Sequence, residues 1–168
     1  MLQEHAKVVQ FISLADGVTG RKKLQKMVYI AKKMNFPFQE KYQLHFYGPY
    51  SEELTLRIEE LCEMGFLAEN SEDKGSYVQY SYSVTGEGRD FIGDAEKVPD
   101  KLGECIGRMK ERSSRFLELV STLLYFDHLP REEQIAKVHI VKNKLNFTDA
   151  EMDEAFSFIG ELAGCIRQ

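Results

Sequence analysis

The first candidate functional residues are a run of basic side chains near the start of the chain. Residues 21–34 contain six cations and no acid. At helical spacing, Lys22, Lys26 and Lys33 share one side and Lys23 lies nearby. The stripe predicts either a solvated helix face, the usual role of a charge run, or an edge that contacts phosphates or an acidic partner. The residues assigned to that edge are Arg21, Lys22, Lys23, Lys26 and Lys33.

A second basic group occurs later, in a segment with helical periodicity. It consists of Lys137, His139, Lys142 and Lys144. The spacings between its lysines do not form one clean stripe, so we expect solvent-exposed surface first and a phosphate platform second.

The residues give little support for catalysis. The four histidines are scattered, and none has a second histidine or a cysteine at metal-binding spacing. Cys62, Cys105 and Cys165 are far apart and lie in apolar helical settings, which favours small core residues over nucleophiles. No nucleophile elbow, phosphate-binding loop or dinucleotide fingerprint is present. The sequence therefore predicts no catalytic residue, no metal site and no cofactor.

A Gly-Pro pair between aromatic residues is a candidate contact site. Tyr47, Gly48, Pro49 and Tyr50 predict an exposed turn that could bind a partner. Equally, the turn could be structural and deliver Ser51 to the cap position of the next helix. The sequence does not choose between these two roles.

The hydrophobic pattern defines the elements that must position these residues. Helical stripes are predicted over residues 3–15, 21–34 and 51–64, with Thr19 and Ser51 as caps, and a short strand over 43–47. After Gly65 come a strand start at 66–68, a polar turn at 69–75 and an alternating strand at 77–84. Thr85 then caps another helix. Helix, strand, loop, strand and helix in this order are typical of the second half of a winged-helix domain.

The rest of the chain is predicted to be helical. Residues 93–99 resemble a linker, and helical periodicity follows over 101–126, from 131 onwards, and after a capping box at 148–151. We therefore expect an α+β, mainly α fold. A winged-helix domain of three helices and a hairpin occupies residues 1–95, and about three helices in 96–168 provide packing or a dimer interface.

The charge of the third predicted helix disfavours DNA binding, which is the usual function of a winged helix. Residues 51–64 carry five glutamates against Arg57 alone, a net charge of −4. In DNA-binding proteins of this kind, a helix enters the major groove and phosphate contacts supply much of the affinity. DNA stays open as a partner, but its contact through this helix is disfavoured.

Composition indicates the cellular compartment of the chain and its relation to membranes. The chain of 168 residues has a net charge of −5, and its odd number of separated cysteines fits a reduced, cytoplasmic setting. It shows no signal-peptide pattern and no apolar run of membrane-spanning length, so we expect no membrane association.

Two motifs resemble known families. Residues 20–31 (Gly-Arg-Lys-Lys-Leu-Gln-Lys-Met-Val-Tyr-Ile-Ala), followed by 46–54 (Phe-Tyr-Gly-Pro-Tyr-Ser-Glu-Glu-Leu), resemble the YwgA family of uncharacterised bacterial proteins over most of the chain. More distantly, the Lys-Leu-Gln-Lys helix with its Gly-Pro turn is similar to the phage-associated, SocA-like antitoxin domain over residues 20–67. These resemblances imply a regulatory or interaction module and carry no catalytic residues.

Three functions follow as hypotheses. The first is a non-enzymatic winged-helix regulator of transcription that acts as a homodimer and binds nucleic acid through the basic helix or responds to a partner. The second is an antitoxin-like or adaptor-like protein-interaction module that does not bind DNA. The third is an enzyme with a cleft between its two domains.

Overall fold

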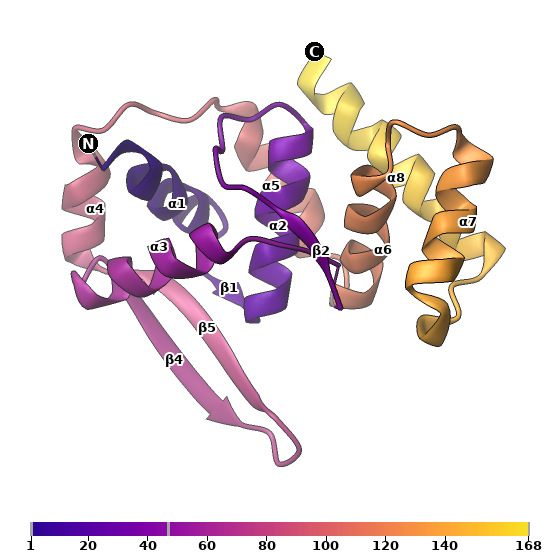
Figure 1. Cartoon of the computed structure of the whole chain (residues 1–168). Helices are drawn as coiled ribbons and strands as arrows, with labels where there is room; N and C mark the ends of the chain where they lie inside the picture. Colours follow the sequence, from indigo (N-terminus) through magenta and orange to yellow (C-terminus); the bar gives the residue numbers. More distant parts are fainter. Residues whose placement is uncertain (1, 47, 168) are drawn as a thin grey trace.

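The fold is α+β and mainly helical, as the sequence predicts (Figure 1). The computed structural model describes residues 2–46 and 48–167. The elements follow one another as α1 (Gln3–Leu14), β1 (Val18–Thr19), α2 (Arg21–Lys33), β2 (Gln43–His45), β3 (Gly48–Tyr50), α3 (Glu52–Glu63), β4 (Leu67–Asp73), β5 (Val78–Val84), α4 (Gly86–Gly93), α5 (Lys101–Lys110), α6 (Ser114–Tyr125), α7 (Arg131–Val141), a 3₁₀ turn (Asn143–Leu145) and α8 (Asp149–Arg167).

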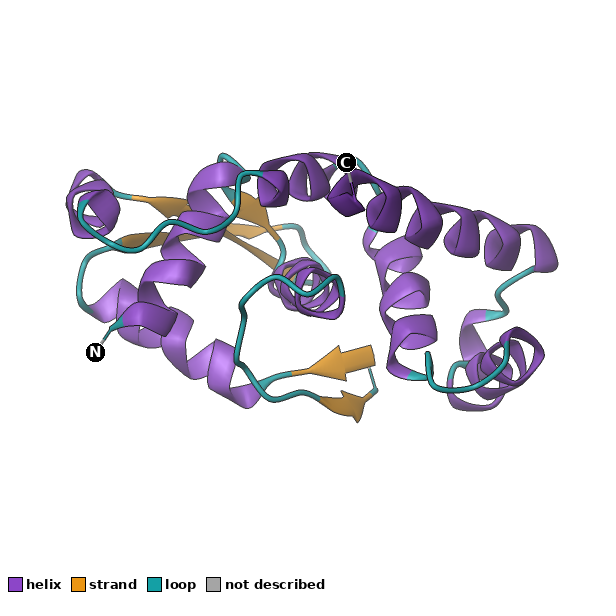
Figure 2. Cartoon of the chain, turned by 90° about the horizontal axis from the view of Figure 1, so that it is seen from above, coloured by secondary structure: helices purple, strands orange, loops and turns teal. Residues whose placement is uncertain are grey.

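In the described parts of the chain, the strands form two separate antiparallel sheets, which appear as two orange groups in Figure 2. One sheet has the order β1-β5-β4, and the other pairs β2 with β3. The hairpin predicted after Gly65 is present, with Leu67 opposite Val84 and Asp73 opposite Val78. Its first strand continues through residues predicted to be a turn, because Glu69 to Asp73 each pair with a residue of β5. The turn itself is confined to residues 74–77.

Side-chain caps define several helix starts. Ser51 Oγ accepts a hydrogen bond from the backbone N–H of Leu54 at 3.1 Å, and Thr85 Oγ1 accepts one from Gly88 at 3.0 Å, as predicted. Thr148 and Glu151 form the predicted capping box. The prediction of Thr19 as a cap is wrong, because β1 pairs this residue with Ser81 and Gly20 occupies the N-cap position of α2.

The segment 96–168 contains one more helix than the periodicity indicated. The apolar pattern over 101–126 is divided into α5 and α6, since Ser113 Oγ caps a new helix by accepting from the N–H of Phe116. Between α4 and α5 the chain is held rather than free: Gln10 donates to the carbonyl of Glu96 and accepts from the N–H of Val98, both at 3.0 Å.

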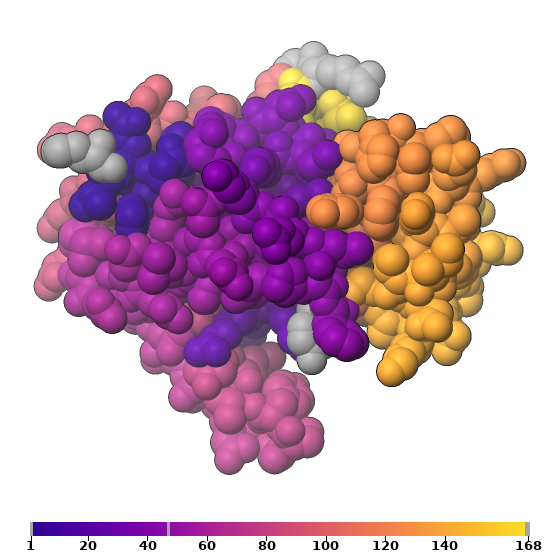
Figure 3. Space-filling view, in the orientation of Figure 1, coloured from indigo at the N-terminus to yellow at the C-terminus, as the bar shows by residue number. Residues whose placement is uncertain are grey.

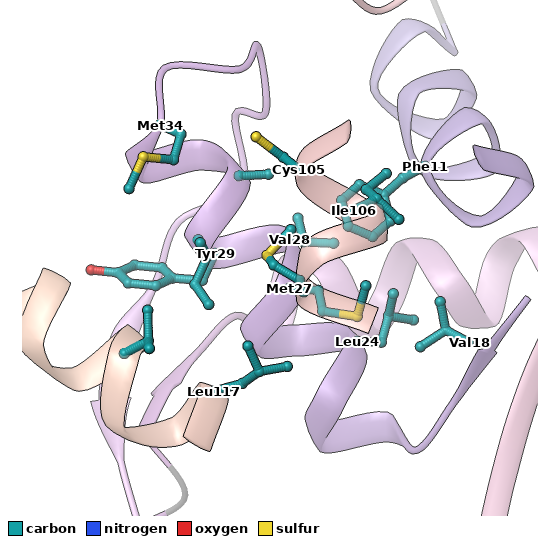
Figure 4. Close-up of a cluster of buried hydrophobic side chains, with 14 of the residues drawn as sticks. Phe11, Val18, Leu24, Met27, Val28, Tyr29, Met34, Cys105, Ile106 and Leu117 are labelled. Carbon is teal, nitrogen blue, oxygen red and sulfur yellow. The ribbon is translucent and has the colours of Figure 1, made fainter. Parts of the chain in front are cut away.

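Helix α2 lies at the centre of the hydrophobic core (Figure 4). Leu24, Met27 and Val28 from α2 pack with Phe11 of α1, Ile106 of α5 and Leu117 of α6. The core is therefore continuous across the segment 93–99 and includes both the N-terminal and C-terminal helices. This central place explains why α2, although rich in lysine, has eight consecutive buried residues from Leu24 to Ala31.

The two hairpins occupy different environments. The hairpin β4–β5 projects away from the helices into solvent (Figures 1 and 3). The hairpin β2–β3 instead lies against α2 and α6. None of the helices in the described parts of the chain has the length and hydrophobicity needed to span a lipid bilayer.

Candidate functional site

A cavity at the N-terminal end of α2 is lined by residues of α2, β3, α3 and the base of the hairpin β4–β5. Its volume is about 270 Å³. The side chains around it combine three cations, two carboxylates, several hydroxyl or amide groups and an apolar wall. They are Arg21, Lys22, Leu24, Gln25, Lys26, Pro49, Tyr50, Thr55, Ile58, Glu59, Glu69 and Tyr82. The structure thus brings three of the five predicted anion-contacting residues to one cavity.

Arg21 is fixed at the cavity mouth by the base of the projecting hairpin. Its guanidinium carbon lies 3.6 Å from the centre of the Tyr80 ring, and its Nε donates to Tyr82 Oη at 3.1 Å. Glu69 Oε2 lies 3.5 Å from Arg21 Nη2 and accepts a hydrogen bond from Tyr82 Oη at 2.7 Å. Burial and this bond to Glu69 raise the pKa of Tyr82, so its hydroxyl stays protonated and can donate.

The remaining predicted cations lie in different places. Lys22 is exposed and lines the cavity. Lys23 donates to the carbonyl of Lys110 at 2.8 Å, and Lys33 forms an ion pair with Asp127 at 2.9 Å. These two lysines therefore connect α2 to the C-terminal helices and do not form a continuous basic surface with Lys22.

Lys26 contradicts the prediction of a solvent-facing stripe. Only 2% of its surface is exposed, and its Nζ lies 3.6 Å from Glu118 Oε1. The helical wheel places Lys26 correctly beside Lys22, but α6 covers that part of the helix. Burial lowers the pKa of Lys26 to about 8, with Lys22 and Lys142 adding to the lowering and Glu118 opposing it.

Lys142 is the second buried lysine, and it corrects the prediction of a solvated cluster near the end of α7. Its Nζ lies 3.8 Å from Glu118 Oε2 and donates to the carbonyl of Phe46. Burial lowers its pKa. Lys137, His139 and Lys144 are exposed, as predicted. The position of Lys142 depends on the packing of the hairpin β2–β3 against the C-terminal helices, which helical spacing within α7 does not reveal.

The Gly-Pro turn is buried, so the prediction of an exposed contact turn is wrong for its central residues. Gly48 and Pro49 form part of β3, and a side chain at Gly48 would meet Glu118, Ser121 and Thr122 of α6. Tyr50 is half-buried and lines the cavity, with its hydroxyl 2.8 Å from Thr55 Oγ1. The turn has the structural role of bringing Ser51 to its cap position. Tyr47, which was assigned to the same turn, lies outside the described residues.

Glu118 is the residue that sequence reasoning missed. It is 8% exposed and lies between the two buried lysines of the cluster Lys26–Glu118–Lys142. A signal was available, because Glu118 is the one acid in the apolar run from Phe116 to Leu124. An acid on the apolar face of a helix requires a buried partner. The partner's identity could not be read from the sequence.

The exposed face of α3 is acidic, as the sequence indicated. Glu52, Leu56, Glu59 and Glu63 are exposed and recur at intervals of four, three and four residues, which places them on one side of the helix. Arg57, the single cation of this helix, is directed to the buried carboxylate of Glu40. It therefore does not neutralise the exposed stripe.

The described residues contain no group of three or more His, Cys, Asp or Glu side chains placed to bind a metal ion. The cysteines have the surroundings predicted for core residues, because Cys105 and Cys165 are buried and Cys62 is half-buried. Burial raises the pKa of Cys105 to about 11, which disfavours its nucleophilic thiolate form.

Comparison with known proteins agrees with the resemblance seen in the motifs. No family model matches the chain. The chain is 58% identical over 163 residues to a protein of Bacillus subtilis (strain 168) named "Uncharacterized protein YwgA", covering 96% of this chain and 98% of the relative. The chain therefore belongs to the YwgA family.

Proposed function

We propose that the chain is a non-enzymatic winged-helix regulatory protein that acts on a protein partner through the exposed face of α3. The observation that carries the proposal is the stripe Glu52, Leu56, Glu59 and Glu63, which presents one apolar side chain among three carboxylates. A surface of this kind complements a basic partner surface with an apolar contact at its centre.

The order of the elements supports the winged-helix part of the proposal. Helices α1, α2 and α3 precede a hairpin whose second strand pairs with β1, so that the sheet has the order β1-β5-β4. The hairpin projects beside α3, in the manner of a wing (Figure 1). In this arrangement α3 is the helix that DNA-binding relatives of the class would insert into the major groove.

Charge argues against that use of α3. Phosphate contact is the largest sequence-independent contribution to DNA affinity, and the exposed stripe of α3 offers carboxylates instead of cations. The basic residues of α2 do not replace them, because Lys26 is buried and Lys23 and Lys33 contact the C-terminal helices. Specific contact with a protein therefore fits the surface better than contact with DNA.

A DNA-binding assay with a charge-reversed variant tests this proposal. We expect the wild-type chain to leave a fluorescently labelled duplex unbound even at low salt, where phosphate attraction is strongest. The variant Glu52→Lys/Glu59→Lys/Glu63→Lys should gain salt-dependent binding, because it reverses the charge of the docking helix. The matched control Glu104→Lys/Glu111→Lys/Glu133→Lys changes net charge equally at exposed positions outside α3 and should gain much less. Salt-dependent binding by the wild type would favour the DNA-binding regulator instead.

A photo-crosslinking amino acid placed on the surface tests which face of the protein contacts the partner. We expect the crosslinker at Leu56 to capture one protein in living bacteria, whereas the same residue at Ile140 should not. Both positions are exposed apolar side chains, at 57% and 71%, but Ile140 lies on α7. Capture at Leu56 should disappear when Glu59→Lys and Glu63→Lys are added. Equal capture at both positions would contradict the assignment to α3.

A further inference from the structure

We propose that the cavity at the N-terminal end of α2 is a binding site for a small organic anion, with its charged head between Lys22 and Lys26 and its apolar body against α3. This site does not rest on the protein-binding proposal above, although Glu59 belongs both to the cavity lining and to the exposed stripe of α3. Its ligand class is an alkyl or aryl carboxylate or phosphate, since both head groups accept charge-assisted hydrogen bonds from lysine and arginine.

The buried cluster beside the cavity has unequal charge. Lys26 and Lys142 face the single carboxylate of Glu118, at 3.6 and 3.8 Å. With a pKa of about 8, Lys26 is mostly protonated at neutral pH, which leaves two buried cations against one anion. A buried charge without compensation is unfavourable, so an anion in contact with Lys26 would stabilise the cluster.

Lys26 is the member of the cluster that has a donor to spare for the cavity. Lys142 Nζ already donates to the carbonyl of Phe46 and lies 3.4 Å from that of His45. An ammonium group has three donors, and the Lys26 ammonium lies 3.6 Å from one carboxylate oxygen of Glu118. Lys26 lines the cavity, so the proposed anion would approach its ammonium group from the cavity while Glu118 stays in place on α6.

The walls of the cavity define the rest of the ligand. Leu24, Pro49 and Ile58 provide an apolar surface next to the cations. The volume of about 270 Å³ lies just below the range of roughly 300–1,000 Å³ for ligand pockets, so the ligand is small. Glu59 and Glu69 also line the cavity and would repel a polyanion. A single anionic head with a short hydrocarbon body matches all three features.

The position of the cavity gives the ligand a regulatory consequence. Glu69 and Tyr82 belong to the base of the projecting hairpin, whereas Ile58 and Glu59 belong to α3. A ligand between them would connect the hairpin to the helix that carries the exposed acidic stripe. Its binding would therefore favour one orientation of the hairpin relative to α3.

Titration of the full chain with matched probes tests the site. The probes are hexanoate and hexyl phosphate, which distinguish the two head groups, hexylamine, which has the opposite charge, and inorganic phosphate, which lacks the apolar body. NMR follows the side-chain ammonium of Lys26 and the backbone amides around the cavity. We expect hexanoate or hexyl phosphate to bind at least about tenfold more tightly than hexylamine and inorganic phosphate, since a hydrogen bond to a charged group contributes on that scale.

Three variants separate the contribution of Lys26 to binding from that of the general charge of the helix. Lys26→Met should weaken binding of the anionic probe about tenfold or more, and it leaves Glu118 paired with Lys142. Lys33→Met removes a cation from the same helix outside the cavity and should leave binding unchanged. Lys22→Met, at an exposed position, should weaken binding without a change in the folded core.

The pH dependence of the wild type provides a test that needs no substitution. Glu118 of α6, Lys22 of α2 and Lys142 after α7 face Lys26, and Glu59 and Glu69 lie around the same cavity. Because Lys26 must be protonated to hold the anion, affinity for hexanoate should fall about tenfold from pH 7 to pH 9. This loss should be absent in Lys26→Met, where the other groups remain.

Three results would overturn the site. These are absence of binding by either anionic probe at millimolar concentration, equal affinity for hexanoate and hexylamine, or binding that is insensitive both to Lys26→Met and to pH. None of them involves DNA or a protein partner, so failure here is distinguishable from failure of the α3 proposal.

Discussion

The two hairpins in the described parts of the chain each contain a left-handed glycine, but their surroundings are opposite. Gly48 and Gly75 each adopt a left-handed backbone, with φ of +91° and +93°, and each lies among aromatic and polar residues. Yet a side chain at Gly75 would meet nothing within 4 Å, whereas one at Gly48 would meet three residues of α6. The backbone requirement of a turn is therefore local, but its exposure depends on what packs against it.

The ion pairs at the two hairpins also differ in exposure. In the projecting hairpin, Lys74 and Glu72 pair at 3.0 Å on the surface. Beneath the hairpin β2–β3, Glu118 pairs with two lysines that are almost fully buried. An exposed pair contributes little to stability, whereas removal of one member of a buried group leaves an uncompensated charge.

The largest expected effect comes from removing the buried carboxylate. Glu118→Gln should lower the free energy of unfolding by about 3–5 kcal/mol, because Lys26 and Lys142 would remain buried without an anion. Urea unfolding measures this value. Glu72→Gln, which breaks the exposed pair of the other hairpin, should change it by less than about 0.5 kcal/mol. Similar losses for both variants would remove the distinction between the two ion-pair environments.

The second-largest expected effect on stability comes from the base of the projecting hairpin, which is tightly packed although the tip of the hairpin is exposed to solvent. A Cβ at Gly88 would lie 2.2 Å from the carbonyl oxygen of Phe66 and 2.9 Å from Val84 Cγ1. Gly88→Ala should therefore destabilise the chain by about 3 kcal/mol, measured by thermal or urea unfolding. Gly86→Ala in the same helix meets no atom within 4 Å and should be neutral or stabilising. A tolerated Gly88→Ala would show that the hairpin base can move.

Asparagine at the two left-handed glycines separates the effect of burial on stability from the effect of backbone strain. Asparagine tolerates the left-handed conformation better than most residues. Gly75→Asn should consequently cost less than about 1 kcal/mol. Gly48→Asn places an amide against Glu118, Ser121 and Thr122 and should cost about 2–3 kcal/mol more. Equal costs in urea unfolding would mean that the backbone alone decides both positions.

The smallest expected effect is the pH dependence of the unfolding free energy that arises from the titration of Lys26. Its folded pKa of about 8 lies below the ordinary value of 10.5, so the unfolded chain binds more protons between these values and stability rises with pH. From pH 7 to pH 9 the contribution should be about 1 kcal/mol. The measurement is the difference in unfolding free energy between wild type and Lys26→Met, which cancels the titration of tyrosines and cysteines. A difference that stays constant or falls with pH would contradict the lowered pKa.

Prediction from sequence succeeded where the signal was local. The caps Ser51 and Thr85, the capping box at Thr148 and the stop at Gly65 depend on residues within a few positions of one another. The paired strands after Gly65 followed from the alternation of apolar residues. The acidic face of α3 was likewise correct, because that helix has one covered side and its charges lie on the other.

Prediction failed where a surface was covered by a distant segment. The wheel of α2 placed Lys22 and Lys26 on one side, but α6 covers Lys26 and leaves Lys22 exposed. The Gly-Pro turn lost its expected exposure for the same reason, since α6 packs against β3. Helical periodicity describes the angle at which a side chain leaves its helix and contains no information about a partner about ninety residues away.

The sequence by itself determined the elements of this protein, the chemistry of its helix ends and its membership of the YwgA family through the basic helix and the Gly-Pro motif. Only the tertiary structure decided that two lysines from distant segments share the carboxylate of Glu118, and that Arg21, Lys22 and Lys26 meet at one cavity. The physical reason is that helix capping and strand pairing in a short hairpin are local interactions, whereas burial of a charge depends on the packing of the whole chain.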